Sequence, residues 1–270
     1  MEIRVIREIR VLLNIAILIF FRLNIYKGAC MSTTIHQTKS YLYLPDTNKR
    51  IFNHRQRTKY KMKIEISPTN TPRKDAFELW MTSPMPMVTI TKTFDVTNLT
   101  KISKKSGYKI NALLCWCIGK AASGIEEFYL LPEHGKLFQY DELAINIIVR
   151  NSQNGINSCD IPYSNDFEKF YEHYVCQTKK TAQECKSSYL EDHMIIGTSA
   201  VIHTELDSII NQYTDKFSNP MLMWGKIREH WFKNKLPISF QFHHVQMDGG
   251  HAAHFFERLQ QEIRSFKVKC

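Results

Sequence analysis

The chain has 270 residues, of which 43% are hydrophobic and 23% charged, enough apolar side chains for one packed domain. Its formal net charge of +10 would suit a nucleic-acid or membrane surface, but residues 1–61 carry +9 of it, with 12 of the 36 Lys and Arg and 3 of the 26 Asp and Glu. Residues 62–270 are therefore nearly neutral, which argues against a nucleic-acid groove on them.

Residues 1–61 differ in composition from the rest of the chain. Arg4, Arg7 and Arg10 precede an apolar run over residues 11–21, which resembles the charged and apolar regions of a signal peptide. The run is shorter than the about 20 apolar residues that span a bilayer. Residues 32–61 are polar and basic without apolar periodicity, so they cannot build a packed core. We interpret residues 1–61 as a disordered or mis-started basic extension rather than a membrane anchor, and place the folded domain at residues 62–270.

In the first part of this domain, the apolar residues are spaced as in helices, and one strand is predicted between the first two helices. A short helix is predicted at residues 74–80 and a strand at residues 87–96. A second helix is predicted at residues 98–106, and Gly107 is expected to end it. Residues 110–123 are apolar on nearly every face, a pattern that is typical of a buried helix.

The second part of the domain contains most of the predicted strands. Residues 136–140 and 143–150 are expected to pair with each other, and a helix with an aromatic stripe begins near residue 165. Three further strands are predicted at residues 194–202, 220–228 and 236–245, the last two joined through residues 233–235. This mix predicts an α/β protein, specifically an α+β two-layer sandwich in which helices pack on a mixed, mostly antiparallel sheet.

The last predicted strand runs into the pattern His-His-x-x-x-Asp-Gly at residues 243–249. Alternation along the strand places Phe242 on one face and His243 on the other, and returns His244 to the inward face of Phe242. A neutral imidazole, with an ordinary pKa of about 6.5, can accept a proton from a hydroxyl when a rigid element aims it into a pocket. His244 is therefore a candidate general base, and the alternative is a core histidine whose ring nitrogens are satisfied. Apolar residues at helical spacing follow the motif at positions 252, 255, 256, 259 and 263.

The seven cysteines match neither a disulfide framework nor a zinc site. Cys115 and Cys117 fall within the predicted buried helix. His251 and His254 are three residues apart, but the pattern offers them no third metal ligand. The sequence predicts no metal site, and the odd number of cysteines favours a reducing, cytoplasmic compartment.

Four stretches of residues 62–270 together resemble the chloramphenicol acetyltransferases of the trimeric, His-His-x-x-x-Asp-Gly type. Residues 73–78 resemble the family's opening Arg-Lys-Glu-x-Phe-Glu segment, and residues 198–200 its strand with the oxyanion serine. Residues 219–226 resemble its Pro-x-x-Thr-Met-Gly-Lys segment, and residues 243–249 are the histidine motif. Their order and approximate spacing fit, apart from a small deletion before residue 220.

The resemblance implies a role for each matched residue. His244 would be the general base on the acceptor hydroxyl, and Ser199 would donate a hydrogen bond to the tetrahedral oxyanion, a contribution of several kcal/mol. Asp248 and Arg73 would form a structural ion pair. The fold would be that of the CoA-dependent acyltransferases, and the active sites of a homotrimer would lie between subunits. Acetyl-CoA would be the acetyl donor, without a metal, and chloramphenicol or a similar hydroxyl-bearing small molecule the acceptor, which would give antibiotic resistance in the cytoplasm. Neither nucleic acid nor a membrane is implied as a partner.

Some positions depart from the family pattern. Met223 stands where the family usually has a threonine that orders a water, and Trp80 stands where it has an acceptor-pocket tyrosine or phenylalanine. Val201 and Ile202 replace the family's Pro-Trp. Trp80 and Met223 are therefore predicted acceptor-pocket residues, and these departures bear on the identity of the acceptor rather than on the acyl-transfer chemistry.

Two alternatives remain open at this point. The first is another acyltransferase with the same histidine motif that acts on a different hydroxyl acceptor, such as a dihydrolipoamide acyltransferase core or a peptide-synthetase condensation domain. The former normally carries a lipoyl domain, and the latter is about twice as long as this chain. The second alternative is an inactive protein of the chloramphenicol acetyltransferase type that only binds its ligand, and such a protein would not turn over a thioester.

Overall fold

The computed structural model describes residues 63–214 and 216–268. The predicted basic extension at residues 1–61 and the domain boundary at residue 62 lie outside these residues. Within the described ranges, no helix has both the length and the apolar character needed to cross a membrane.

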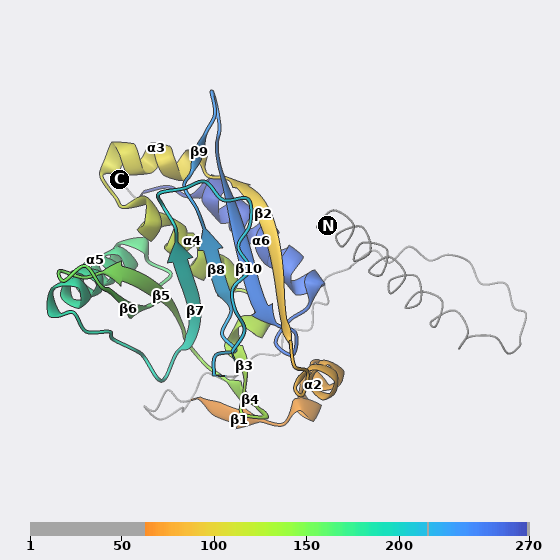
Figure 1. Ribbon diagram of the computed structural model, residues 1–270. Helices are drawn as coiled ribbons and strands as arrows, with labels where there is room; N and C mark the ends of the chain where they lie inside the picture. Colours follow the sequence, from red (N-terminus) through yellow and green to blue (C-terminus); the bar gives the residue numbers. More distant parts are fainter. Residues whose placement is uncertain (1–62, 215, 269–270) are drawn as a thin grey trace, which may run out of the picture. The chain divides into compact units, whose positions relative to one another are not determined.

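A mixed sheet of seven strands forms the centre of the described chain, in the order β2-β10-β8-β7-β5-β6, with β9 beside β10 (Figure 1). The strands are β2 (Met87–Asp95), β5 (Leu143–Arg150), β6 (Ile156–Pro162), β7 (Met194–Ala200), β8 (Met221–Trp224), β9 (Arg228–Glu229) and β10 (Asn234–His243). β7 runs parallel to β5 and to β8, and the other neighbouring pairs are antiparallel. The predicted fold class, a mostly antiparallel sheet packed by helices, is confirmed.

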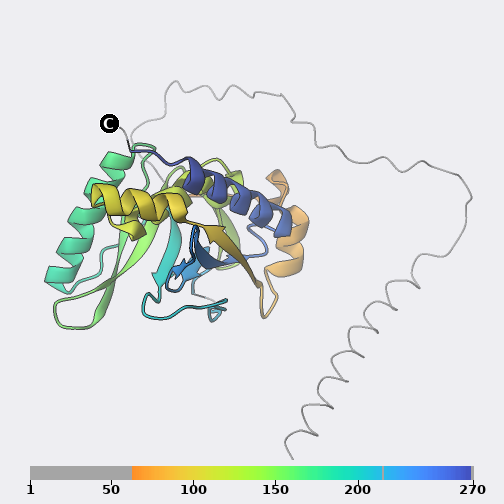
Figure 2. The ribbon, with the colours of Figure 1, turned by 90° about the horizontal axis from the view of Figure 1, so that it is seen from above.

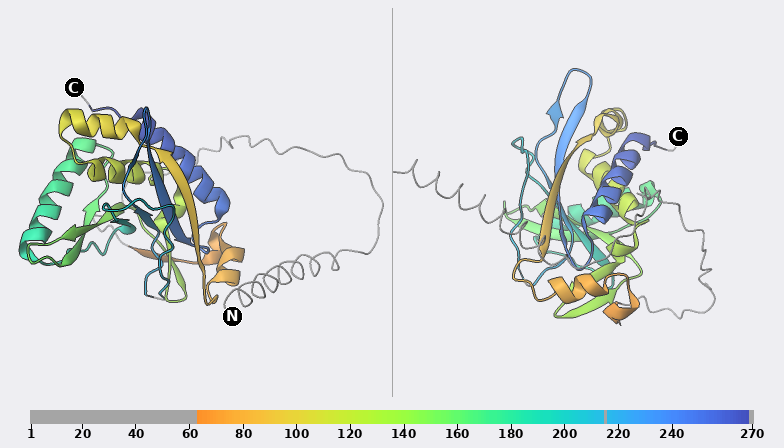
Figure 3. Two further views of the ribbon diagram at one scale, coloured as in Figure 1. Left: turned by 45° about the horizontal axis from the view of Figure 1, so that its top comes forward. Right: turned by 90° about the vertical axis from the view of Figure 1, so that its right-hand side faces the viewer.

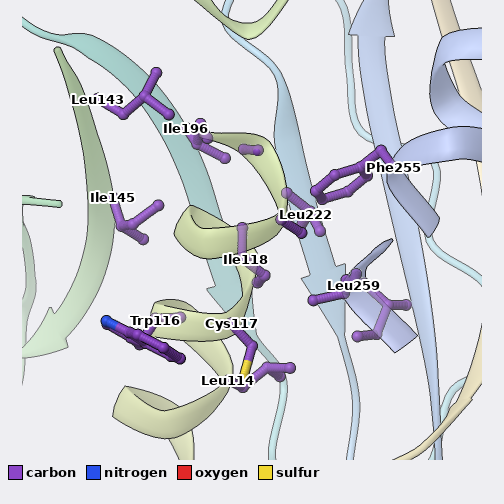
Figure 4. Packing of buried hydrophobic residues seen from close by; sticks show 14 of the residues in the cluster. Leu114, Trp116, Cys117, Ile118, Leu143, Ile145, Ile196, Leu222, Phe255 and Leu259 are labelled. Atoms are coloured by element: carbon purple, nitrogen blue, oxygen red, sulfur yellow. The ribbon is translucent and has the colours of Figure 1, made fainter. Parts of the chain in front are cut away.

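Four helices lie on one side of this sheet, as Figure 2 shows: α3 (Thr97–Ser106), α4 (Ile110–Ala122), α5 (Phe167–Glu184) and α6 (Gly249–Ser265). α4 lies at the centre of the core because its apolar residues face every direction. Figure 4 shows its side chains packed between the sheet and α6, with Leu114, Trp116, Cys117 and Ile118 near Leu143, Ile145, Ile196, Leu222, Phe255 and Leu259.

Residues 201–214 and 216–220, between β7 and β8, cover part of the other side of the sheet (Figure 2). The Ile209 N–H donates to Ser239 Oγ at 2.8 Å, and Gln241 Nε2 donates to the Asn211 carbonyl at 3.0 Å. Both faces of β10 are therefore buried, and His243, which faces away from Phe242, is only 2% exposed.

A second, antiparallel sheet supports the end of the large sheet where β10 finishes. It contains β1 (Ile64–Ile66), β4 (Lys136–Gln139) and β3 (Leu130–Glu133), in the order β1-β4-β3. The helix α2 (Lys74–Trp80) lies beside it (Figure 1). A small apolar cluster joins α2, this sheet and the residues after β10: Leu130, Leu137 and Val245 are buried, with Ile66, Phe77, Trp80 and Met81 packed against them. Two 3₁₀ turns, Pro68–Asn70 and Glu126–Tyr129, complete the connections.

The limits of several helices agree with the predictions. α2 spans the predicted residues, and α3 ends at Gly107, whose φ of 79° is in the left-handed region that glycine adopts without a steric penalty. α5 begins after Asp166, whose carboxylate accepts the N–H groups of Glu168 and Lys169.

The predicted pairing of residues 136–140 with residues 143–150 is wrong. β4 pairs with β1 and β3, whereas β5 pairs with β6 and β7. The reason is that residues 141–142 carry the chain from the small sheet into the large one, where the Glu142 carbonyl accepts the Met194 N–H at 2.8 Å. Predicted strand 220–228 is also divided, because residues 225–227 separate β8 from β9. The predicted link at residues 233–235 is shorter, because β10 already begins at Asn234, and this hairpin projects beyond the sheet (Figure 3).

Candidate active site

His244 lies in a turn between the sheet and α6. Strand β10 ends at His243, and residues 244–246 form the turn that leads to the start of α6 at Gly249. The sequence predicted a strand through residue 245, but the strand alternation stops before His244 and does not set the direction of its side chain. Backbone contacts of the turn do so instead, beginning with the His244 N–H, which donates to the Pro86 carbonyl at 2.8 Å.

The Arg73 guanidinium binds three acceptors of this turn, a set of contacts that we call the Arg73 clamp. Nη2 donates to the His244 carbonyl at 2.8 Å, Nε donates to the Val245 carbonyl at 3.0 Å, and Nη1 donates to Asp248 Oδ2 at 3.1 Å. Arg73 caps the N-terminus of α2 and is 7% exposed. A planar guanidinium with fixed donors suits this task because it binds several oxygens at once in one orientation.

Asp248 connects the Arg73 clamp to α6. It is the N-cap residue, and its Oδ1 accepts the N–H groups of Gly250 at 2.9 Å and His251 at 3.3 Å. The His251 ring bridges Asp248 Oδ1 at 2.9 Å and Glu127 Oε1 at 3.1 Å. Burial alone would raise the pKa of the Asp248 carboxyl, but the His251 backbone and side chain and the Arg73 guanidinium hold its pKa below the ordinary value.

The imidazole of His244 stacks on the indole of Trp80. The ring centroids are 4.6 Å apart and the planes are inclined by only 4°. The ring is half-buried, and its Nδ1 is buried without a hydrogen-bond partner among the described residues. The backbone of His244 is thus fixed by hydrogen bonds, whereas its ring is fixed by the flat contact with Trp80.

His243 has a different environment from its neighbour. Its Nδ1 accepts the Val245 N–H at 3.1 Å, which requires a neutral ring with an unprotonated Nδ1. Burial, followed by the proximity of His244, lowers the pKa of His243 to about 4. His243 is therefore a neutral structural residue at physiological pH.

Ser199 and Met223 lie far from His244 within one chain. Ser199 pairs with Met223 across β7 and β8, and Met223 pairs with Ser239 on β10, so the three share one face of the sheet. The Thr198 side chain points to the other face, where it bonds the Asn146 carbonyl. His243, the last residue of β10, follows Ser239 by four residues, so it lies roughly 14 Å along the strand and roughly 10 Å across two strand spacings from Ser199.

The structure therefore brings together four of the six predicted site residues, Arg73, Trp80, His244 and Asp248, and leaves Ser199 and Met223 elsewhere. Sequence reasoning missed His251 and Gln246. Asp248 and His251 have the N-cap and N3 spacing of a capping box, which could have identified His251. Gln246 is completely buried and donates to the Leu130 carbonyl at 2.6 Å, and no sequence pattern indicates this contact.

No group of three or more His, Cys, Asp or Glu that could hold a metal ion is present among residues 63–214 and 216–268. The cysteines of the same ranges are unpaired: Cys115, Cys117, Cys159, Cys176 and Cys185. Burial raises the pKa of the Cys115 thiol to about 12, so this side chain is a neutral core group.

Comparison with known proteins identifies the family whose sequences this chain matches. The family model of chloramphenicol acetyltransferases matches residues 60–260. Chloramphenicol acetyltransferase 3 of Escherichia coli is 26% identical over 208 residues, which cover 74% of this chain and 96% of the relative. Chloramphenicol acetyltransferase of Staphylococcus aureus is also 26% identical, over 74% of this chain and 95% of the relative.

Solved structures show the same fold. A chloramphenicol acetyltransferase structure aligns with a TM-score of 0.65 and 23% identity, over 75% of this chain and all of that one. A probable dihydrolipoamide acetyltransferase from Listeria monocytogenes aligns with a TM-score of 0.56 and 11% identity, over 74% of this chain and 93% of that one. At these identities, the structural likeness concerns the fold.

The first prediction concerns the Arg73 clamp. Arg73→Ala should lower the free energy of unfolding by about 3 kcal/mol, because it leaves a half-buried carboxylate and two carbonyls without their donor. Asp248→Asn should cost about 1 kcal/mol, because the amide oxygen can still cap α6. If the two side chains interact, the double variant will lose about 1 kcal/mol less than the sum of the single losses. Urea unfolding of the four proteins measures this, and strictly additive losses would show that Arg73 and Asp248 do not interact.

The second prediction concerns the pH dependence of stability. His243 has a pKa of about 4 in the folded chain, below the value of about 6.5 expected when unfolded, so the unfolded state binds more protons between these values. The stability that this residue contributes is fully present above pH 6.5 and is lost as the pH falls toward 4. Between pH 7 and pH 5, the chain should lose about 2 kcal/mol more than His243→Asn, which keeps a neutral acceptor for the Val245 N–H. Equal losses in both proteins would contradict this assignment.

Proposed function

The chain belongs to the chloramphenicol acetyltransferase family, and from this we propose that it transfers the acetyl group of acetyl-CoA to a hydroxyl of chloramphenicol, which would give resistance to the antibiotic. The observation that carries the proposal is the half-buried imidazole of His244, held on a turn by the Arg73 clamp and by Trp80. A general base must be neutral, accessible on one side and fixed in direction, and this arrangement supplies a rigid support for it.

The proposed reaction uses His244 as a general base. The imidazole Nε2 takes the proton of the acceptor hydroxyl while the hydroxyl oxygen attacks the thioester carbonyl carbon, which gives a tetrahedral intermediate with a negative oxygen. The intermediate then collapses with cleavage of the carbon–sulfur bond. The CoA thiolate leaves and takes the proton from the imidazolium, so that His244 returns to its neutral form. No metal or redox step is needed for this balance.

Ser199 is proposed to donate its hydroxyl hydrogen to the oxyanion of the intermediate. A hydrogen bond of this kind needs a donor within about 3 Å of that oxygen. The strand register separates Ser199 from His243, the residue before His244, by roughly 17 Å within one chain. The same thioester can contact both side chains only if they come from two copies of the chain. This geometry supports a homo-oligomer with the site between subunits, and we propose the homotrimer that the sequence resemblance implies.

A second acceptor class is favoured by one observation. The flat face of Trp80 covers one side of the His244 ring, and an indole occupies more space than the tyrosine or phenylalanine that the sequence comparison suggested at this position. A bulkier wall beside the base would select a differently shaped hydroxyl acceptor. The alternative proposal is therefore acetyl transfer to another hydroxyl-bearing small molecule by the same residues. Met223, which is 7% exposed on the face of Ser199, offers no hydroxyl to hold a water there.

We further propose that residues 62–270 are sufficient for this activity and that the enzyme works in the cytoplasm, where acetyl-CoA is available. The described site residues fall between Arg73 and His251. The unpaired state of the described cysteines is consistent with a reducing compartment.

The third prediction tests the activity. Release of the CoA thiol from acetyl-CoA should depend on added chloramphenicol, and His244→Ala should lower kcat by about 10²- to 10⁴-fold because the general base is lost. Ser199→Ala should lower kcat by about 10²-fold. His254→Ala, which removes an exposed histidine of α6, is the matched control and should keep full turnover.

A panel of hydroxyl-bearing acceptors separates the two proposals for the same enzyme. Turnover with another hydroxyl compound but not with chloramphenicol would favour the alternative acceptor. A wild-type chain that binds acetyl-CoA but releases no thiol with any acceptor would contradict both, and full turnover by His244→Ala would contradict the mechanism.

The fourth prediction tests the domain boundary. Residues 1–61 carry +9 of the net charge, whereas the site residues lie after Met62. A chain that begins at Met62 should match the full chain in turnover. Sedimentation should also show that it assembles with the same number of subunits. It should also lose any salt-sensitive attachment to anionic surfaces, because this attraction depends on the basic charges removed. An inactive or monomeric shortened chain would show that residues 1–61 belong to the working enzyme.

A further inference from the structure

The hairpin between β9 and β10 ends in two exposed aromatic side chains. The two strands pair up to the turn, where the His230 N–H donates to the Lys233 carbonyl at 3.0 Å. Trp231 and Phe232 therefore occupy the centre of the turn. Such positions usually hold glycine, asparagine, aspartate, serine or proline, because those residues suit the turn backbone. Here Trp231 is 96% exposed and Phe232 is 88% exposed, so neither the turn nor the core explains these side chains.

This aromatic tip projects from the end of the large sheet that lies opposite His244 (Figure 3). The tip precedes the first residue of β10 and His244 follows the last, and the ten residues of this strand span roughly 30 Å. At the base of the hairpin, the Arg228 guanidinium forms ion pairs with Glu205 and Asp207, which belong to the segment after β7. The structure therefore holds the tip away from the core and from the candidate active site.

Lysines surround the base of the tip. Residues 226–235 hold four Lys or Arg and one Glu, and their three lysines are exposed. α3 lies beside the start of β10 (Figure 1), where Asn234 Nδ2 donates to Thr100 Oγ1 at 2.7 Å. The helix has three exposed lysines and no acidic residue: Lys101, Lys104 and Lys105. Even with the neighbouring carboxylates counted, this end of the molecule carries seven basic and four acidic side chains, the latter being Asp95, Glu205, Asp207 and Glu229.

We propose that this end of the protein is a membrane-contact surface, in which Trp231 and Phe232 enter the interface of a bilayer and the lysines bind anionic phospholipid headgroups. Aromatic rings are favoured at the boundary between headgroups and acyl chains, where an indole also keeps its N–H hydrated. Basic side chains near an anionic leaflet are attracted to it within about a Debye length. A contact of this kind rests on the surface of the bilayer and needs no spanning helix.

The shape of the tip favours a lipid surface over other partners. A bilayer interface is soft and accommodates a projecting turn, whereas a folded protein would need a cavity of matching shape. Single-stranded nucleic acid is usually bound in a basic groove, in which aromatic side chains stack on successive bases. Trp231 and Phe232 stand on a projecting hairpin instead (Figure 3). Because His244 lies at the other end of β10, contact with a membrane through this tip leaves the candidate active site uncovered.

Flotation of the full chain with lipid vesicles tests the contact. Vesicles of phosphatidylcholine and phosphatidylserine should bind more protein than vesicles of phosphatidylcholine alone. Trp231→Ala/Phe232→Ala should weaken binding by at least about 10-fold, because two apolar side chains no longer leave water. Lys233→Gln/Lys235→Gln should weaken it by about 10-fold for the anionic vesicles only. Ile156→Ala changes a 76% exposed apolar residue of β6 and is the matched control, which should bind as the unmodified chain does.

Tryptophan fluorescence locates the contact on the chain. Of the four tryptophans, Trp116 and Trp224 are buried, Trp80 is half-buried, and Trp231 is almost fully exposed. Bromine atoms on the lipid acyl chains quench the emission of an indole that enters the bilayer. Vesicles that contain brominated phosphatidylcholine should therefore quench the emission of the unmodified chain. Trp231→Phe keeps an aromatic tip, so it should still bind these vesicles but should show no quenching.

The two measurements together decide the proposal. Equal binding by Trp231→Ala/Phe232→Ala and the unmodified chain would overturn it, because residues 1–61, present in every variant, would then account for the attachment. Quenching that persists in Trp231→Phe would also overturn it. A blue shift of the Trp231 emission with rising protein concentration, without vesicles, would assign the tip to contact between copies of the chain instead. Tip-dependent binding to single-stranded RNA that exceeds binding to vesicles would assign it to nucleic acid. Urea unfolding of each variant checks that the compared chains are equally folded.

Discussion

The three-pronged contact of Arg73 is the constraint on which the rest of the site depends. Its guanidinium ties the N-terminus of α2 to the His244 and Val245 carbonyls and to the carboxylate that caps α6. These groups come from parts of the sequence about 170 residues apart. Without the guanidinium, the two carbonyls and Asp248 Oδ2 would lose this donor, a loss that we expect to cost about 3 kcal/mol. These contacts hold the turn that carries His244, the proposed base, against α2 and the start of α6.

A continuous series of side-chain contacts connects Arg73 with the ring of His244, the proposed general base. The small sheet fixes α2 through Leu130 and Leu137, and α2 presents Trp80 to the ring of His244. On the other side, Asp248 sets the start of α6, whose aromatic residues pack against Phe240 in the core. His244 is therefore connected through side-chain packing to both the small sheet and the main core. Ser199 is fixed independently, by the register of β7 with β8. In the proposed site between subunits, the relative position of the two proposed catalytic groups would therefore depend on how two copies of the chain meet.

The sequence predicted local features better than contacts between distant elements. Apolar spacing and Gly107 predicted α2 and α3 closely, because helix limits depend on nearby residues. The partner of β4 was missed, since residues 136–140 carry no information about which strand comes beside them. The burial of one face of β10 could not be predicted either, because Ile209 and Asn211, from the segment between β7 and β8, cover Ser239 and Gln241. The family resemblance predicted that Trp80 is an acceptor-pocket residue, whereas the stack on His244 follows from the packing of α2 and could not be inferred from spacing.

The claim that one site takes His244 and Ser199 from different copies of the chain can be tested by mixing two inactive variants. Chains with His244→Ala and chains with Ser199→Ala should each have little acetyl-transfer activity alone. When they are unfolded together, refolded and allowed to assemble at random, about one site in four should combine an intact His244 with an intact Ser199. We predict that the mixture recovers about a quarter of the activity of the unmodified chain. A mixture no more active than its two components would contradict a site shared between subunits.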